Sequence, residues 1–197
     1  MIYKPCEGFR HADFMASLLE KLFSGTSSPA RELYRSIVEQ SRRLEFFVEL
    51  GVPDTPTGRF EVLVLHLFLV MHRMREEEEH TELARSLSEE AVLDFDRNLR
   101  EIGIGDLSVG RKVKSLAEGM YGRLGAYMDG LEGGDAELSE ALRRNLYSET
   151  TPSEEVVTAI VIYVKRETLA LSSQSSSILQ DGLVKFGSPL GNKGNDL

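Results

Sequence analysis

Cysteine is almost absent from this chain of 197 residues, in which Cys6 is the only one. A single cysteine excludes an intramolecular disulfide, a zinc knuckle and a paired redox motif, and it fits a reducing compartment. Basic residues are also in deficit: 23 Lys and Arg stand against 32 Asp and Glu, for a net charge of −9. Because nucleic-acid binding needs clustered Lys and Arg, this composition argues against a general nucleic-acid binder.

Long apolar runs are missing as well. The longest central stretch without Asp, Glu, Lys or Arg is 62–72, about half of the length that a membrane-spanning helix requires. The first thirty residues contain no continuous apolar segment and include Glu7, Asp13 and Glu20, which predicts neither a secretory signal nor a mitochondrial transit peptide. We therefore expect a soluble, untargeted chain in the cytoplasm.

The sequence offers no catalytic motif. Gly103 and Gly105 lack the third glycine and the preceding strand of a nucleotide-binding loop. There is no Gly-x-Ser-x-Gly segment, and Cys6 has no credible partner base. We therefore predict no catalytic residue and no bound cofactor.

A metal site is a weaker possibility on one helical segment. His72, Glu76 and His80 recur every four residues, so one helix face could present all three. A helical di-iron centre needs two Glu-x-x-His motifs, and Glu77 to His80 is the only one. We predict no metal, and a helical metalloenzyme remains an alternative interpretation.

Apolar residues recur at helical spacing through most of the chain, and no stretch alternates convincingly with period two. This predicts an all-α fold: a single bundle of about six helices. Ser28 and Thr55 precede prolines as helix caps, and Ser108 is a further expected cap. The expected helices are 29–50, 56–75, 82–102, 108–131, 136–147 and 153–171.

Three regions follow from this pattern. Residues 1–28 are expected to be an extension with a possible short helix over 11–23, and 29–171 to be the helical domain. Residues 172–197 are rich in Ser, Gly, Asn and Asp, so we expect a disordered tail.

The helix over 56–75 is apolar nearly all round, which is typical of the central helix of a bundle. Arg59, His66 and Arg73 recur every seven residues and share one side of it. His66 lies among apolar residues, which favours a hydrogen-bonded core histidine over a functional group.

Two charged segments flank the turn near Glu78. If the helices before and after this turn are antiparallel neighbours, Arg59 and Arg97 face each other, since each is nineteen residues from Glu78. One corner would then hold both segments, with Asp54, Arg59, Arg97, Glu101 and Asp106. It could be a salt-bridge network that locks helix ends, or a docking surface for a partner.

The ordered motifs resemble one known family. Residues 51–60 read GVPDTPTGRF, residues 94–106 contain D-x-D-x-x-LRE-x-GIGD, and residues 121–123 are Tyr-Gly-Arg. Together they resemble the ubiquinol–cytochrome c chaperone family over roughly 33–171. Leu44 stands where a proline is usual in that family, so we expect the first helix to run straight.

The resemblance implies a non-enzymatic assembly chaperone that binds newly made cytochrome b and supports biogenesis of the bc1 complex. It further implies cytochrome b or another bc1 subunit as partner, with a small co-chaperone, the ribosome and a peripheral position at the inner membrane as further possibilities. A haem-ligand role for His66 would fit a haem-protein client, and a helical interaction module with another client is the alternative function. The candidate partner-binding residues are Asp54, Arg59, His66, Arg73, Asp94, Asp96, Arg97, Arg100, Glu101, Asp106, Tyr121 and Arg123.

Overall fold

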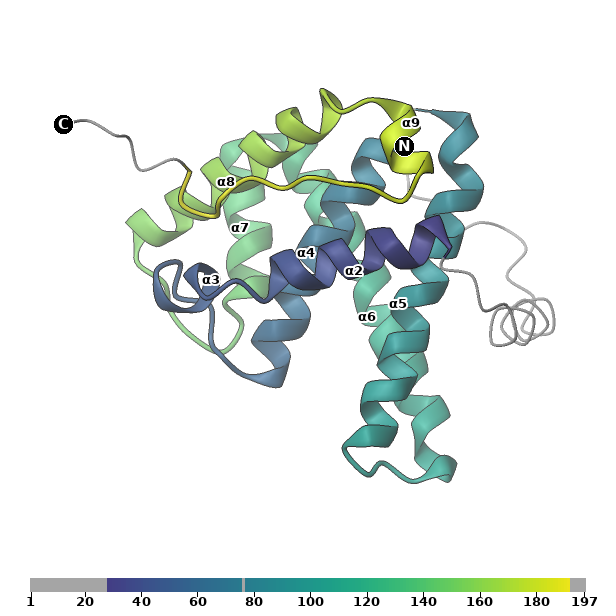
Figure 1. Ribbon diagram of the computed structural model, residues 1–197. Helices are drawn as coiled ribbons and strands as arrows, with labels where there is room; N and C mark the ends of the chain where they lie inside the picture. The colour runs from purple at the N-terminus through teal and green to yellow at the C-terminus, as the bar shows by residue number, and fades with distance from the viewer. Residues whose placement is uncertain (1–27, 76, 192–197) are drawn as a thin grey trace.

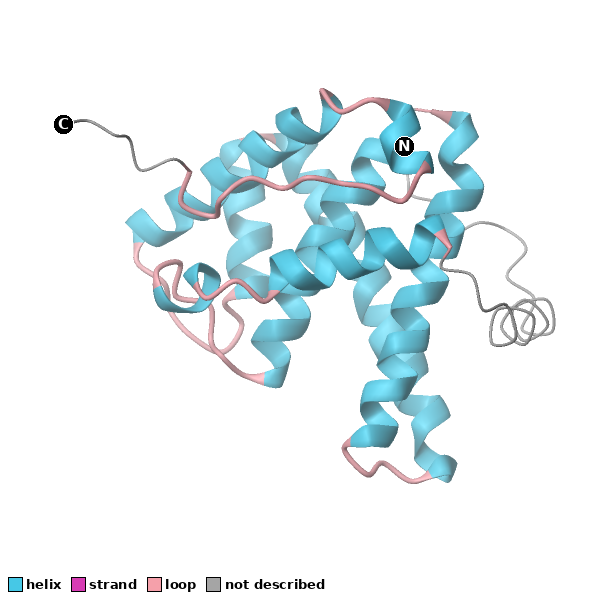
Figure 2. Cartoon of the chain, viewed as in Figure 1, coloured by secondary structure: helices cyan, strands magenta, loops and turns pink. Residues whose placement is uncertain are grey.

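The computed structural model describes residues 28–75 and 77–191, and these stretches contain helices and loops without a strand, as predicted (Figure 2). The expected extension over 1–28 lies outside the described residues except for Ser28, as does its possible helix over 11–23. The elements are α2 (Pro29–Ser41), α3 (Glu45–Val48), α4 (Pro56–Met74), η1 (Glu78–His80), α5 (Thr81–Glu101), α6 (Asp106–Gly133), α7 (Asp135–Leu146), α8 (Glu154–Ser172) and α9 (Ser176–Gln180).

Helix α4 is the central helix, as its sequence predicted. It packs against α2, α6, α7 and α8, and most of its side chains are buried (Figure 1). Its start is defined by the Thr55 hydroxyl, which accepts a hydrogen bond of 3.0 Å from the N–H of Gly58, and by Pro56 in the first helical position. Each fully buried aliphatic side chain of α4 stabilises the fold by about 1.5–3 kcal/mol.

Helices α5 and α6 form a long antiparallel hairpin whose far end projects from the rest of the molecule (Figure 1). Gly103 lies in the connecting turn with a φ of +84°, which favours glycine. Helix α6 begins at Asp106, two residues before the expected cap, and the Ser108 hydroxyl instead donates to the carbonyl of Gly105. We call the projecting end, residues 97–114, the arm tip.

The expected single helix over 29–50 is wrong, because the chain breaks after Ser41. The Ser41 hydroxyl donates to the carbonyl of Val38, and the short helix α3 follows in a new direction. On a continuous helix Phe46 would point away from Ile37, nine residues earlier. The break turns Phe46 into the core, where it is fully buried, and leaves Leu44 exposed.

The expected disorder over 172–197 is wrong for the described part, 172–191. After α8 the chain forms α9 and then an extended segment, 183–191, which runs back along α8 (Figure 1). We call this segment the C-terminal strap. The Glu167 carboxylate accepts the Gly187 N–H at 2.8 Å, and the Gln40 amide donates to the Gly187 carbonyl at 2.9 Å.

Composition could not show this, because buried side chains of distant helices provide the strap's hydrogen-bond partners. Val184 is buried and Phe186 packs against the core. Residues 192–197 lie outside the described residues.

Candidate functional site

A groove of about 810 Å³ lies between α2 and α3, the first turns of α4, and the α5–α6 hairpin. It brings together Asp54 and Arg59 from the first motif, Asp94 from the second and Arg123 from the third. Of the five residues that the spacing argument placed at one corner, Asp54 and Arg59 line this groove, whereas Arg97, Glu101 and Asp106 do not. The apolar lining consists of Val38, Leu44, Phe47, Phe60, Leu63, Phe95, Leu99, Ile102 and Leu116.

The junction between the two charged segments is apolar. The rings of Phe60 and Phe95 lie 5.5 Å apart between α4 and α5. The ion pairs form within each segment: Arg59 binds Asp54 at 2.6 Å, and Arg100 binds Asp96 at 2.6 Å as well as Asp106. The corner therefore combines an aromatic contact with two local ion-pair clusters.

Glu61 and Arg123 form an ion pair at the floor of the groove. Glu61 is fully buried, and Arg123 Nε donates to its Oε2 at 2.6 Å. The same guanidinium lies over the Phe60 ring at 5.3 Å. Burial raises the pKa of Glu61, against the hydrogen bonds from Arg123, and the same hydrogen bonds raise the pKa of Arg123.

Sequence reasoning missed Glu61 as a site residue. The available signal was a lone carboxylate within the most apolar helix of the chain, which requires a buried partner. Arg123 was named as a candidate, but its partner could not be deduced from spacing.

Asp94 is held in place by α2. The Tyr34 hydroxyl donates a hydrogen bond of 2.8 Å to its Oδ2. Burial, followed by the nearby Asp94 carboxylate, raises the pKa of Tyr34, so the phenol stays protonated and continues to donate.

His66 lies inside the molecule. Its Nδ1 donates to the Val62 carbonyl at 2.7 Å, and its Nε2 accepts from the Tyr163 hydroxyl at 2.7 Å. Burial lowers its pKa to about 4, so the imidazole is neutral at pH 7. Because both ring nitrogens have protein partners, the arrangement favours a core histidine over a haem ligand.

Arg73 is also interior. It donates to the carbonyls of Leu171 and Gln174 and pairs with Glu77 at 2.7 Å, which joins α4 to the end of α8. A partner could contact Arg73 or His66 only if the fold opened.

The remaining candidates lie outside the groove lining. Arg97, Arg100, Glu101 and Asp106 are exposed on the arm, and Asp96 beside them is half-buried. Tyr121 is partly buried and packs against the core. The partner-binding role of these residues stays a prediction.

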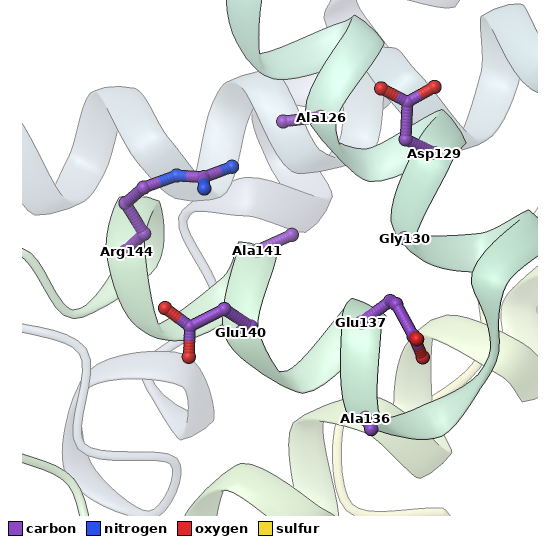
Figure 3. Close-up of a pocket in the computed structure, with 8 residues that line it drawn as sticks. All are labelled: Ala126, Asp129, Gly130, Ala136, Glu137, Glu140, Ala141 and Arg144. Carbon is purple, nitrogen blue, oxygen red and sulfur yellow. The ribbon is translucent and has the colours of Figure 1, made fainter.

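A second, shallower hollow of about 390 Å³ lies between α6 and α7 (Figure 3). Gly130 allows the close approach of the two helices there, since an added Cβ would lie 3.0 Å from the Cα of Leu138. Figure 3 shows small side chains, Ala126 and Ala141, with Asp129 and Glu140 around them. This lining offers an apolar partner less surface than the larger groove does.

Glu77, Glu79 and His80 could present metal ligands, since one ligand atom from each lies within 4.8 Å of the others. Glu77 is already paired with Arg73, and the Ser176 hydroxyl contacts both Glu79 and His80. A cation would have to compete with the Arg73 guanidinium. Of the trio considered from sequence, Glu76 lies outside the described residues.

No helix within the described stretches has the length and apolar content needed to cross a bilayer. An all-helical body with an apolar groove bordered by charged side chains is the architecture of a helical binding protein. The chain belongs to the ubiquinol-cytochrome c chaperone family, whose model matches residues 48–186.

Known proteins agree with this membership. The chain is 26% identical over 139 residues to ubiquinol-cytochrome-c reductase complex assembly factor 1 of Xenopus laevis, covering 70% of each protein. It is 23% identical over 159 residues to the Mus musculus protein of that name, covering 80% of this chain and 54% of the mouse protein. The crystal structure of the Cbp3 homolog from Brucella abortus superposes with a TM-score of 0.73 at 32% identity, covering 89% of this chain and 97% of the other.

Proposed function

We propose that this protein is an assembly chaperone that binds newly made cytochrome b and supports biogenesis of the ubiquinol–cytochrome c reductase complex. The observation that supports the client site best is the groove, because the family's separate motifs converge on it. The names of the relatives indicate which complex is assembled, and the family resemblance suggests cytochrome b as the client.

The groove suits a segment of an unassembled membrane protein. Its walls are aromatic and aliphatic, which favours an apolar client segment that water would otherwise surround. Arg59 and Asp54 lie on its border, with the Arg59 guanidinium 5.8 Å from the centre of the Phe47 ring. These charged groups could fix the register of a client whose apolar segment ends in polar residues.

The proposed action is binding without catalysis: the groove holds the client until assembly. We place the protein in the cytoplasm and at the periphery of the inner membrane, where a membrane-protein client emerges. A small co-chaperone and the ribosome are further partners that the family resemblance suggests.

Leu44 and Val48 provide a matched test of the groove. Leu44 is 70% exposed and lines the groove, whereas Val48 is 73% exposed and does not. Deletion of the gene should deplete the bc1 complex, with cytochrome b lost first and the other respiratory complexes retained. Leu44→Glu should fail to restore bc1 and should no longer crosslink to cytochrome b in growing cells. Val48→Glu should restore bc1 and should still crosslink to cytochrome b.

Normal bc1 content in the deletion strain would refute the chaperone function. If crosslinking identifies a different protein in the groove, the alternative of a helical interaction module with another client takes its place. Circular dichroism of both purified variants should show unchanged helical content, since both positions are at the surface.

A further inference from the structure

The arm tip exposes two large aliphatic side chains at its outermost point. Leu107, in the first turn of α6, is 98% exposed, and Ile102, in the turn after α5, is 73% exposed. The hairpin projects from the bundle at this end (Figure 1). The core of the fold needs neither side chain, but Ile102 also lines the groove, so Leu107 is the one available to a separate external surface.

The arm tip is also basic in an acidic protein. Residues 97–114 contain five basic and two acidic side chains, a local charge of +3 in a chain whose net charge is −9. Arg100 pairs with Asp106 beside Leu107 and also with Asp96, just before the arm tip. Arg97, Arg111 and Lys112 are exposed on the same end of the hairpin, as is the acidic Glu101.

Helical geometry aligns these groups. Leu107, Arg111 and Lys114 recur at i, i+4 and i+7, so they share one exposed face of α6. An aliphatic group at the outermost point, with cations one and two turns behind it, fits the boundary of a bilayer. There the side chain enters the acyl region while the cations remain at the phosphate level.

We propose that the arm tip docks on the surface of an anionic lipid bilayer, with Leu107 entering the interface. The charge distribution supports this partner, because an anionic surface attracts the tip and repels the remainder of the chain, which has a net charge of −12. Only the arm tip would then contact the membrane, and the groove would remain accessible beside it. The inference names the contact surface for the membrane association proposed above.

Vesicle flotation of the full chain tests this inference without any client. Vesicles of phosphatidylcholine with about one third phosphatidylglycerol should bind the protein, vesicles of phosphatidylcholine alone should bind far less, and high salt should release it. Arg111→Glu with Lys112→Glu should weaken partitioning about tenfold or more, because each cation near an anionic surface contributes about fivefold. Leu107→Ser should weaken it several-fold.

Two control variants match these changes away from the tip. Arg35→Glu with Lys185→Glu alters the net charge equally at two exposed positions, and Leu169→Ser removes a side chain that is 72% exposed on α8. Both should bind like the unaltered chain. No binding to anionic vesicles, equal binding to neutral ones, or equal losses in the controls would overturn the inference. The crosslink to cytochrome b does not depend on these outcomes, so failure here leaves the proposed client site to be judged separately.

Discussion

The Tyr163 hydroxyl donates a hydrogen bond to His66 and accepts one of 3.1 Å from the Gln40 amide. These three side chains come from α8, α4 and α2, so one hydroxyl links three helices. Phe46 lies against both rings, at 5.1 Å from His66 and 5.2 Å from Tyr163. The hydrogen-bonded Tyr163 hydroxyl and His66 imidazole are thus enclosed at the centre of the bundle.

This enclosure predicts a pH dependence of stability. The pKa of His66 falls from 6.5 in the unfolded chain to about 4 in the fold, so between these values the unfolded chain binds more protons. The contribution is fully present above pH 6.5 and is lost as the pH falls toward 4. The slope is at most about 1.4 kcal/mol per pH unit. Urea unfolding across this range measures it.

Two variants separate the imidazole from its hydrogen bond. His66→Gln should be less stable near pH 7 and should lose the part of the slope that His66 contributes. Tyr163→Phe leaves the buried Nε2 of His66 without a donor, at a cost of about 1–3 kcal/mol, but should keep the slope because the imidazole remains buried. An unchanged slope in His66→Gln would contradict the assignment.

Arg123 and Arg59, both in the groove lining, should differ in their importance to stability. Arg123→Ala leaves the fully buried Glu61 carboxylate without its partner and should destabilise by about 3–5 kcal/mol. Arg59→Ala removes an ion pair in which both side chains are more than half exposed, and should cost about 1 kcal/mol or less. Chemical denaturation of the two variants measures this difference in the free energy of unfolding. Glu61→Leu combined with Arg123→Leu should regain much of the loss, since no buried charge is left.

At the scale of the elements, most helix starts were predictable, with the expected cap at Ser108 as the exception, whereas the interruption after Ser41 was not. Ser28, Thr55 and Ser153 each accept a hydrogen bond from the first turn of a helix, so local chemistry marks these three starts. The break after Ser41 has no comparable marker, because tertiary burial of Phe46 determines it. Likewise, Glu61 and Tyr163 find partners that depend on side-chain conformation rather than on spacing.

The C-terminal strap should contribute strongly to stability. A chain truncated after Ser175 loses the burial of Leu179 and Val184 and leaves Glu167 without the Gly187 N–H. Two buried aliphatic side chains are worth about 1.5–3 kcal/mol each, so the free energy of unfolding should fall by about 3 kcal/mol or more. Thermal unfolding against a control chain ending at Gly191 measures this, and an unchanged melting temperature would contradict the packing.

At the scale of the whole molecule, residue counts around the turn near Glu78 predicted that the two charged segments lie close together. The Phe60–Phe95 contact agrees with this prediction, whereas Arg97, Glu101 and Asp106 lie outside the shared groove lining. The six principal helices and the central position of α4 were predictable from periodicity. The projection of the arm and the groove beside it were not, since both depend on crossing angles that spacing does not determine. The side chains that close the core come from both ends of the described chain, as Gln40 and the strap show.

The strap has a consequence for the order in which the protein matures during synthesis. Residues 183–191 are translated after α2 to α8, yet the Phe186 ring lies 5.3 Å from the His66 ring at the centre of the bundle. Translation proceeds from the N-terminus, so the helices emerge while their last packing partner is still being made. Nascent chains arrested before Val184 should remain sensitive to protease, and chains extended beyond Gly191 by a linker should become resistant. The bundle that carries the proposed client groove would thus be completed only after residues 183–191 have left the ribosome.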